Sequence, residues 1–239
     1  MRWELPLCAA NAPAVSTPKT LSTRVRLSNK ESAFRPIGFL FIEGTNTLKS
    51  SRLNAGLKVP GDGVNPPDTA GNAFLTVMAQ STGSLTVTGN SGIGGGEWND
   101  QLSGSITING GTVMATGGSG GGAGIGGGWH FTTGGNGGRI MIYGGTVTAT
   151  GGVFTAGVGS GDNGDAGGDV TISGTDTQVT AQGINTYDIG SGVASLTGGN
   201  LAVSGGATVV MRNEYRLTGN KAAFVKVTST NSKIARLKS

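Results

Sequence analysis

The chain has few of the residues on which most catalytic and metal-binding sites depend. Its 239 residues include one cysteine, one histidine and 13% charged residues. The single cysteine, Cys8, can form no internal disulfide bond. The single histidine, His130, lacks the further ligands that a recognisable zinc site requires. The sequence therefore predicts no disulfide scaffold, no zinc centre and no cofactor.

Long apolar runs are also missing. No stretch approaches the roughly 18 apolar residues of a membrane-spanning helix, so we expect no membrane span. The first ten residues, Met1–Ala10, lack the apolar core of about seven or more residues that a signal peptide needs. We therefore expect any export signal to be missing or unrecognisable at this start.

Positive charge is scarce in the middle of the chain. Residues 61–211 contain one basic residue, Arg139, and nine acids, which gives this span a net charge of −8. The other Lys and Arg residues, which bring the whole chain to +4, lie in the two flanks. A nucleic-acid-binding protein places its basic residues on the folded body, where they neutralise phosphates. We therefore expect no nucleic-acid partner.

Glycine is the residue that the chain has in excess. Of its 47 glycines, 43 lie in residues 61–211. They do not recur at every third position, which excludes collagen. They alternate with short β-branched runs that can bury apolar surface, which argues against disorder.

Three segments of the glycine-rich span repeat one pattern: a short alternating strand, a bend and a second alternating strand. These segments are residues 105–118, 139–152 and 169–181. Weaker copies begin at Leu85 and Leu201. The first strands are thus predicted to start at 85, 106, 140, 170 and 201, in steps of 21, 34, 30 and 31 residues. The short first step predicts that the coil at residue 85 lacks its second strand.

A second motif keeps the same period. It places one β-branched residue among glycines, and it recurs at Ile93, Ile125, Val158 and Ile189 with steps of 32, 33 and 31 residues. Two independent motifs with one long period indicate a repeat fold.

This period predicts an all-β fold: a right-handed parallel β-helix, or three-sided β-solenoid, with coils of about 30 residues. The strands are too short to form a stable sheet alone, so successive coils must stack. A sandwich of hairpins would instead need tight turns and no fixed long period. Ile125 is predicted to fill the third side of its coil. The predicted stacks are Ile106 on Ile140 on Val170, and Val113 on Val147 on Val179.

The same pattern divides the chain into three parts. Residues 37–211 form the predicted β-helix domain. Residues 1–36 carry no repeat and are expected to be a cap or a disordered lead. Residues 212–239 lose glycine and gain charge, and we expect a C-terminal capping strand or tail, with a strand around residues 223–227.

The segments Gly44–Leu48 and Ala55–Pro60 read as an early coil. Together with the repeated units and the Ala123–Gly128 motif, they resemble the β-helical repeat regions of large surface proteins of anaerobic, often gut-dwelling, Gram-positive bacteria. The resemblance covers roughly residues 37–211. It implies an extracellular or cell-surface location, and some of these relatives are labelled carbohydrate-binding. It transfers no catalytic residue, because the family has no shared catalytic motif that maps onto this chain.

Polysaccharide lyases and hydrolases share the parallel β-helix. A lyase needs a basic residue beside acidic calcium ligands, and the span 61–211 offers only Arg139. A hydrolase uses paired carboxylates, and the one acidic cluster is Asp162, Asp165 and Asp169. Three roles are open for these acids: they are solvated turn residues, calcium ligands or catalytic groups. We favour the first alternative, because the nonapeptide calcium repeat is absent.

Aromatic residues are the candidate ligand contacts. Trp98 and Trp129 follow the same glycine motif on what should be adjacent coils, and Phe131 follows closely. They form either a stacking platform for sugar rings or a cover over the edge of the coil, since large aromatics usually find apolar partners. The second alternative is the favoured one.

Outward threonines raise the idea of an ice-binding face. The rows are interrupted by Met141 and Ala202 on one face, and by Met114 and Gln178 on the other, which argues against it.

Taken together, the sequence favours a non-enzymatic extracellular β-helix that serves as a structural stalk or adhesive surface of a bacterial surface protein. The alternative is a carbohydrate-binding module for cell-surface or dietary polysaccharide. A polysaccharide lyase or hydrolase is the third hypothesis.

Overall fold

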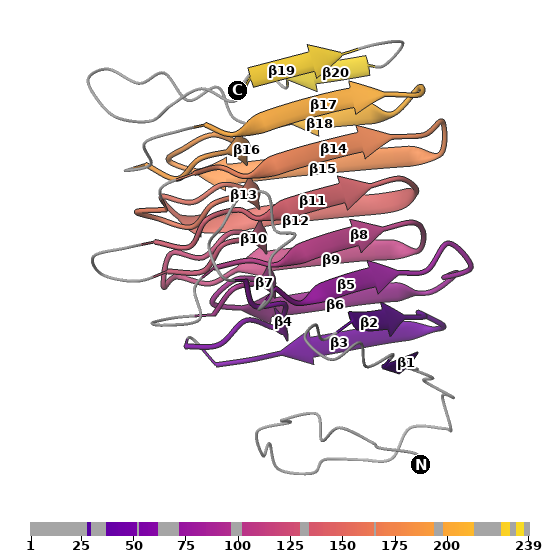
Figure 1. Cartoon of the computed structure of the whole chain (residues 1–239), viewed down its shortest axis with the longest axis horizontal. Helices are drawn as coiled ribbons and strands as arrows, with labels where there is room; N and C mark the ends of the chain where they lie inside the picture. Colours follow the sequence, from indigo (N-terminus) through magenta and orange to yellow (C-terminus); the bar gives the residue numbers. More distant parts are fainter. Residues whose placement is uncertain are drawn as a thin grey trace.

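The chain folds as a column of stacked coils, and successive coils pair through three parallel sheets (Figure 1). The computed structural model describes residues 28–29, 37–51, 53–61, 72–96, 102–129, 134–164, 166–193, 198–212, 226–229 and 233–236. Within these residues, no helix is long and apolar enough to cross a membrane.

The sheets run the length of the column. The first sheet has the order β1-β2-β5-β8-β11-β14-β17-β19, the second β3-β6-β9-β12-β15-β18-β20 and the third β4-β7-β10-β13-β16. The strands of the first sheet are β1 (Ser28–Asn29), β2 (Ile37–Leu40), β5 (Phe74–Val77), β8 (Ser105–Ile108), β11 (Arg139–Ile142), β14 (Asp169–Ser173), β17 (Asn200–Ser204) and β19 (Lys226–Ser229). The strands of the second sheet are β3 (Thr45–Lys49), β6 (Ser84–Gly89), β9 (Thr112–Gly117), β12 (Gly145–Val153), β15 (Thr177–Ile184), β18 (Thr208–Met211) and β20 (Lys233–Arg236). The strands of the third sheet are β4 (Leu57–Lys58), β7 (Ile93–Gly94), β10 (Ile125–Gly126), β13 (Val158–Gly159) and β16 (Ile189–Gly190).

The interior of the column is filled by ladders of like residues. Ile140 of β11 pairs in register with Ile106 of β8 and Val170 of β14. Stacking of this kind lets each short strand bury one face against both neighbouring coils. The structure therefore confirms the predicted three-sided β-solenoid and the first predicted stack. The second predicted stack is also present, formed by Val113, Val147 and Val179.

Every strand of the third sheet has two residues, one of which is a buried apolar residue or, in β4, the half-buried Leu57. Ile125 pairs with Ile93 and Val158 and is completely buried, as predicted for the residue that fills the third side. The glycine that follows it, Gly126, has a φ of 132°. Only glycine takes this backbone conformation without strain, which explains why the motif needs glycine at this position.

The coil around residue 85 differs from the prediction. Leu85 lies in the second sheet, where it pairs with Val113 rather than with Ile106. The first strand of that coil is β5, whose Leu75 pairs with Ile106. This coil therefore has both strands, and the step of 21 residues runs from the second strand of one coil to the first strand of the next. The alternating pattern of β6 suits either sheet, so the pattern alone does not identify which sheet it joins.

Both ends of the column extend the first sheet. At the C-terminal end β19 pairs with β17, and β20 extends the second sheet by pairing with β18, both in parallel. At the N-terminal end β1 pairs antiparallel with β2. Apart from β1, residues 1–36 lie outside the described part of the chain, and the three-part division of the chain stays a prediction.

Candidate functional site

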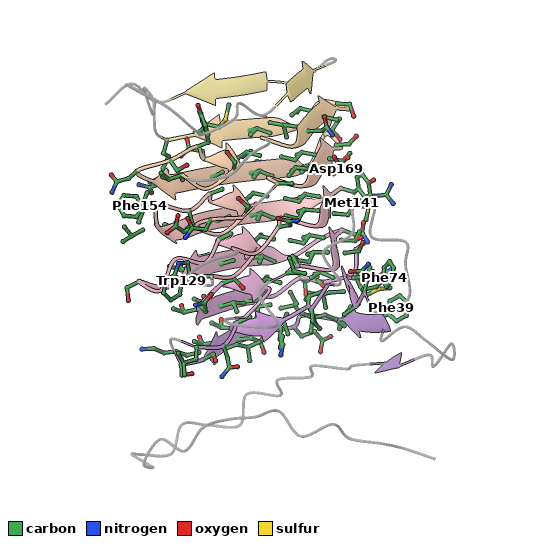
Figure 2. All side chains as sticks on the ribbon, turned by 60° about the vertical axis from the view of Figure 1, so that its left-hand side comes forward. Phe39, Phe74, Trp129, Met141, Phe154 and Asp169 are labelled. Carbon is green, nitrogen blue, oxygen red and sulfur yellow. The ribbon has the colours of Figure 1, made fainter. Side chains whose placement is uncertain are left out.

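Of the three predicted aromatic contacts, only Trp129 falls within the described structure. Trp98 and Phe131 lie outside it, as does His130. Trp129 follows β10 and is half-buried at one edge of the column (Figure 2). Its backbone N–H donates a hydrogen bond to Oδ1 of Asn90 in the preceding coil, at 3.1 Å.

The indole ring of Trp129 lies against the backbone of its own coil. A Cβ atom added at Gly121 would lie 2.8 Å from Cδ1 of the ring, so the ring packs directly on this glycine. The Trp129 side chain also forms a hydrogen bond with Asp162 of the following coil. The indole thus links two coils at the edge while part of it stays exposed, and its role as a ligand contact stays a prediction.

Asp162 supplies the acidic group at this edge. Its backbone N–H donates to the carbonyl oxygen of Gly121 at 2.9 Å. Burial raises the pKa of Asp162 above its ordinary value of 3.8, against smaller lowering effects of the hydrogen bonds from the Asn163 backbone and the Trp129 side chain. A partly buried carboxyl group beside an aromatic ring can accept a hydrogen bond from a bound hydroxyl group.

The raised pKa of Asp162 predicts a pH-dependent effect of Asp162→Asn on stability. The folded protein holds the Asp162 proton more tightly than the unfolded chain. The resulting stabilisation is fully present below pH 3.8 and is lost as pH rises through the raised pKa. Asn mimics the protonated acid and does not titrate. The unfolding free energy of the variant minus that of the wild type should therefore increase from acidic to neutral pH. Urea unfolding at both pH values measures the difference, and Asp176→Asn, at an exposed acid, controls for the loss of one charge. A difference that is the same at both pH values would contradict the prediction.

A second aromatic residue, Phe154, lies at the same edge, and the sequence analysis does not single it out. Phe154 follows β12, is 44% exposed and has a φ of 65°. Figure 2 shows it on the same side of the column as Trp129. The sequence signal that could find it is a bulky pair, Val153 and Phe154, directly after a Gly-Gly bend. Counted back from the paired third-sheet residues Ile125 and Val158, the preceding coil has Gly120 and Gly121 at those two positions.

The predicted acidic cluster does not come together as one site in the described residues. Asp165 lies outside them. Oδ1 of Asp169, at the start of β14, accepts a hydrogen bond from Asn200 at 2.6 Å, whereas Asp162 bonds to Trp129. Figure 2 places Asp169 and Trp129 on opposite sides of the view. Within the described ranges, no group of three or more His, Cys, Asp or Glu residues could hold a metal ion.

The outward rows of the sheets are interrupted as the sequence predicts. On the first sheet, Met141 lies between Thr107 and Thr171 in one register row. On the second sheet, Met114 pairs with Thr148 and is 42% exposed. These rows therefore present hydroxyl groups at irregular intervals.

The comparison with protein families finds the repeat itself. Residues 106–129 and 140–162 match a family model described as Beta helix repeat. Each matched stretch contains strands of all three sheets, from β8 to β10 and from β11 to β13. Searches of curated proteins and of solved structures returned no significant match. The family model and the three parallel sheets agree that the chain contains a β-helical repeat region.

Proposed function

We propose that this chain is a non-enzymatic extracellular β-helix that serves as a structural stalk or adhesive surface of a bacterial surface protein. The proposal depends on the continuous stack of coils. One buried row runs in register along the first sheet through Leu75, Ile106, Ile140, Val170 and Leu201. A stack of parallel coils forms a rod that lengthens by about 4.8 Å with each coil and presents sheets on its sides. Such a body is suited to spacing or displaying surfaces.

The location and the absence of catalysis need support beyond the fold, because a fold alone does not fix a function. The extracellular location is supported by the resemblance of the repeat units to those of bacterial surface proteins. β-Helix folds also occur in polysaccharide lyases, so the placement of charged groups matters. Arg139 pairs in register with Asp169 on the first sheet, whereas Asp162 lies with Trp129 at the edge. Of the two candidate acids in the described residues, only Asp169 therefore lies beside the base, and Asp162 lies apart from it.

Incubation with polysaccharides tests the proposal. The whole chain is mixed with insoluble neutral glycans and with polygalacturonate, and both bound protein and soluble products are measured. We expect no reducing or unsaturated ends above the level without protein. Product formation that disappears in Arg139→Ala or Asp162→Ala would show that the chain is an enzyme and would overturn the proposal.

The second candidate function is carbohydrate binding, favoured by the partly exposed Trp129 beside the carboxyl group of Asp162. In the same experiment, the double variant Trp98→Ala, Trp129→Ala is expected to lose any glycan retention that the wild type shows. If the double variant retains as much glycan as the wild type, these tryptophans do not contact the glycan.

A further inference from the structure

Three exposed hydrophobic side chains meet at the corner where the second sheet ends. Val153, Phe154 and Ile184 are 39%, 44% and 36% exposed. Val153 and Ile184 are register partners on β12 and β15, and the Phe154 N–H donates to the Ile184 carbonyl at 2.8 Å. The half-buried Val193 adjoins them, since its N–H donates to the Phe154 carbonyl at 3.1 Å. The corner is therefore one contiguous apolar patch.

Phe154 has a backbone conformation that bulky residues avoid. Its φ of 65° lies in the left-handed region, which costs about 1–3 kcal/mol for most residues other than glycine. The same position carries Gly121 in the preceding coil and Asn185 in the following coil, also with positive φ, and both of these residue types tolerate it. Phe154 is 44% exposed and lies outside the buried core, so packing offsets only part of the strain. A strained aromatic residue kept at the surface points to a role in binding.

Hydrogen-bonding groups border the patch. The backbone N–H of Asp162 donates to the carbonyl of Gly121, the residue at the position of Phe154 one coil earlier, and Trp129 packs on the same glycine. Phe154 and Trp129 project from the same edge in Figure 2. The exposed Asn185 occupies the equivalent position one coil after Phe154. The corner thus combines two aromatic rings with a carboxyl group and an amide.

We infer that this corner is a binding subsite for one sugar ring of a neutral glycan, with Phe154 as the stacking platform and Asp162 as the acceptor for a sugar hydroxyl. The inference rests on the carbohydrate-binding function proposed above and adds the residues and the class of sugar. The face of an aromatic ring is negative, and it attracts the polarised C–H groups on the flat side of a sugar. An ionised carboxylate accepts a stronger hydrogen bond than a neutral group does, and the Asn185 amide can donate and accept.

The charge of the corner selects against acidic sugars. Asp162 is negative when ionised, and residues 61–211 carry a net charge of −8 with Arg139 as their one basic residue. Arg139 begins β11 in the first sheet, next to Asp169 rather than next to Phe154. A uronic acid at the patch would place two like charges together, which lowers affinity.

The variant Phe154→Gly separates binding from folding. Glycine removes the ring and also relieves the backbone strain, so we expect an unchanged or higher Tm together with at least a tenfold loss of affinity. Affinity is measured by calorimetry with β-1,4-glucan and β-1,4-mannan oligosaccharides, and with oligogalacturonate as the acidic probe. Tyr143→Ala is the matched control, because Tyr143 is 45% exposed just before β12 starts. It should keep the wild-type affinity.

The outcomes distinguish the subsite from the function on which it rests. If the wild type binds none of the probes, the carbohydrate-binding function fails, and the subsite fails with it. If the wild type binds and both Phe154→Gly and Asp162→Asn keep its affinity, only the subsite is overturned. Tighter binding of oligogalacturonate than of both neutral probes would overturn the assignment to neutral sugars.

Discussion

A Gly94→Ala variant is expected to lose more than about 3 kcal/mol of unfolding free energy. Gly94 ends β7 with a φ of 137°, a conformation that an alanine adopts only with strain. A Cβ atom there would also overlap the carbonyl oxygen of Gly126 in the next coil. That oxygen accepts a hydrogen bond from the Gly95 N–H at 2.9 Å, so moving it away would break the pairing of the two coils. Strain and overlap therefore act together at one position.

The matched control is Gly96→Ala, in the same glycine motif and two residues further along. A Cβ atom at Gly96 would meet its nearest neighbours, backbone atoms of Ala55 and Leu53, at 3.7 Å, an ordinary van der Waals contact. We expect a change in stability within about 1 kcal/mol. Urea unfolding of both variants, followed by circular dichroism, gives the comparison. Equal stabilities for the two variants would contradict the argument that the motif needs glycine for its conformation and close packing.

The sequence predicts the coils well because two of its patterns are independent. Alternation identifies which residues of a strand face inward, and the isolated Ile125 between glycines marks the third side once in each turn. Both patterns recur with one period, so only a stack of coils satisfies them together. The prediction that Leu85 starts a first strand is wrong, because alternation identifies the inward residues of a strand but not the sheet to which the strand belongs. Strands of the first and second sheets have the same inward and outward pattern, and only the pairing partner distinguishes them.

The candidate site is less predictable, because it depends on backbone conformation and on contacts between coils. Trp129 can be selected from the sequence, since it follows a regular motif. Its contact with Gly121 and its bond to Asp162 depend on which residues the stacking brings together. Phe154 is a candidate ligand contact because its backbone has a positive φ and its side chain is exposed. Composition and period do not encode either property.

An Ile140→Ala variant is expected to lose about 2–5 kcal/mol of unfolding free energy. Ile140 is completely buried and pairs with Ile106 below it and Val170 above it in the stack. Removing its side-chain carbons leaves a cavity that the neighbouring coils cannot close, because their own positions are fixed by parallel pairing on both sides. Each coil contacts mainly its neighbours in a solenoid, so a cavity at this point weakens two interfaces at once.

The next residue along β11 provides the control. Met141 points outward from the same strand and is half-buried, between Thr107 and Thr171. Met141→Ala removes a side chain of similar size from the same backbone environment but leaves no closed cavity, so we expect a loss of less than about 1.5 kcal/mol. Both variants are compared by urea unfolding under the same conditions. If Met141→Ala were as destabilising as Ile140→Ala, the buried ladder could not be the main source of stability. The continuous inward row would then not explain why these short strands stack.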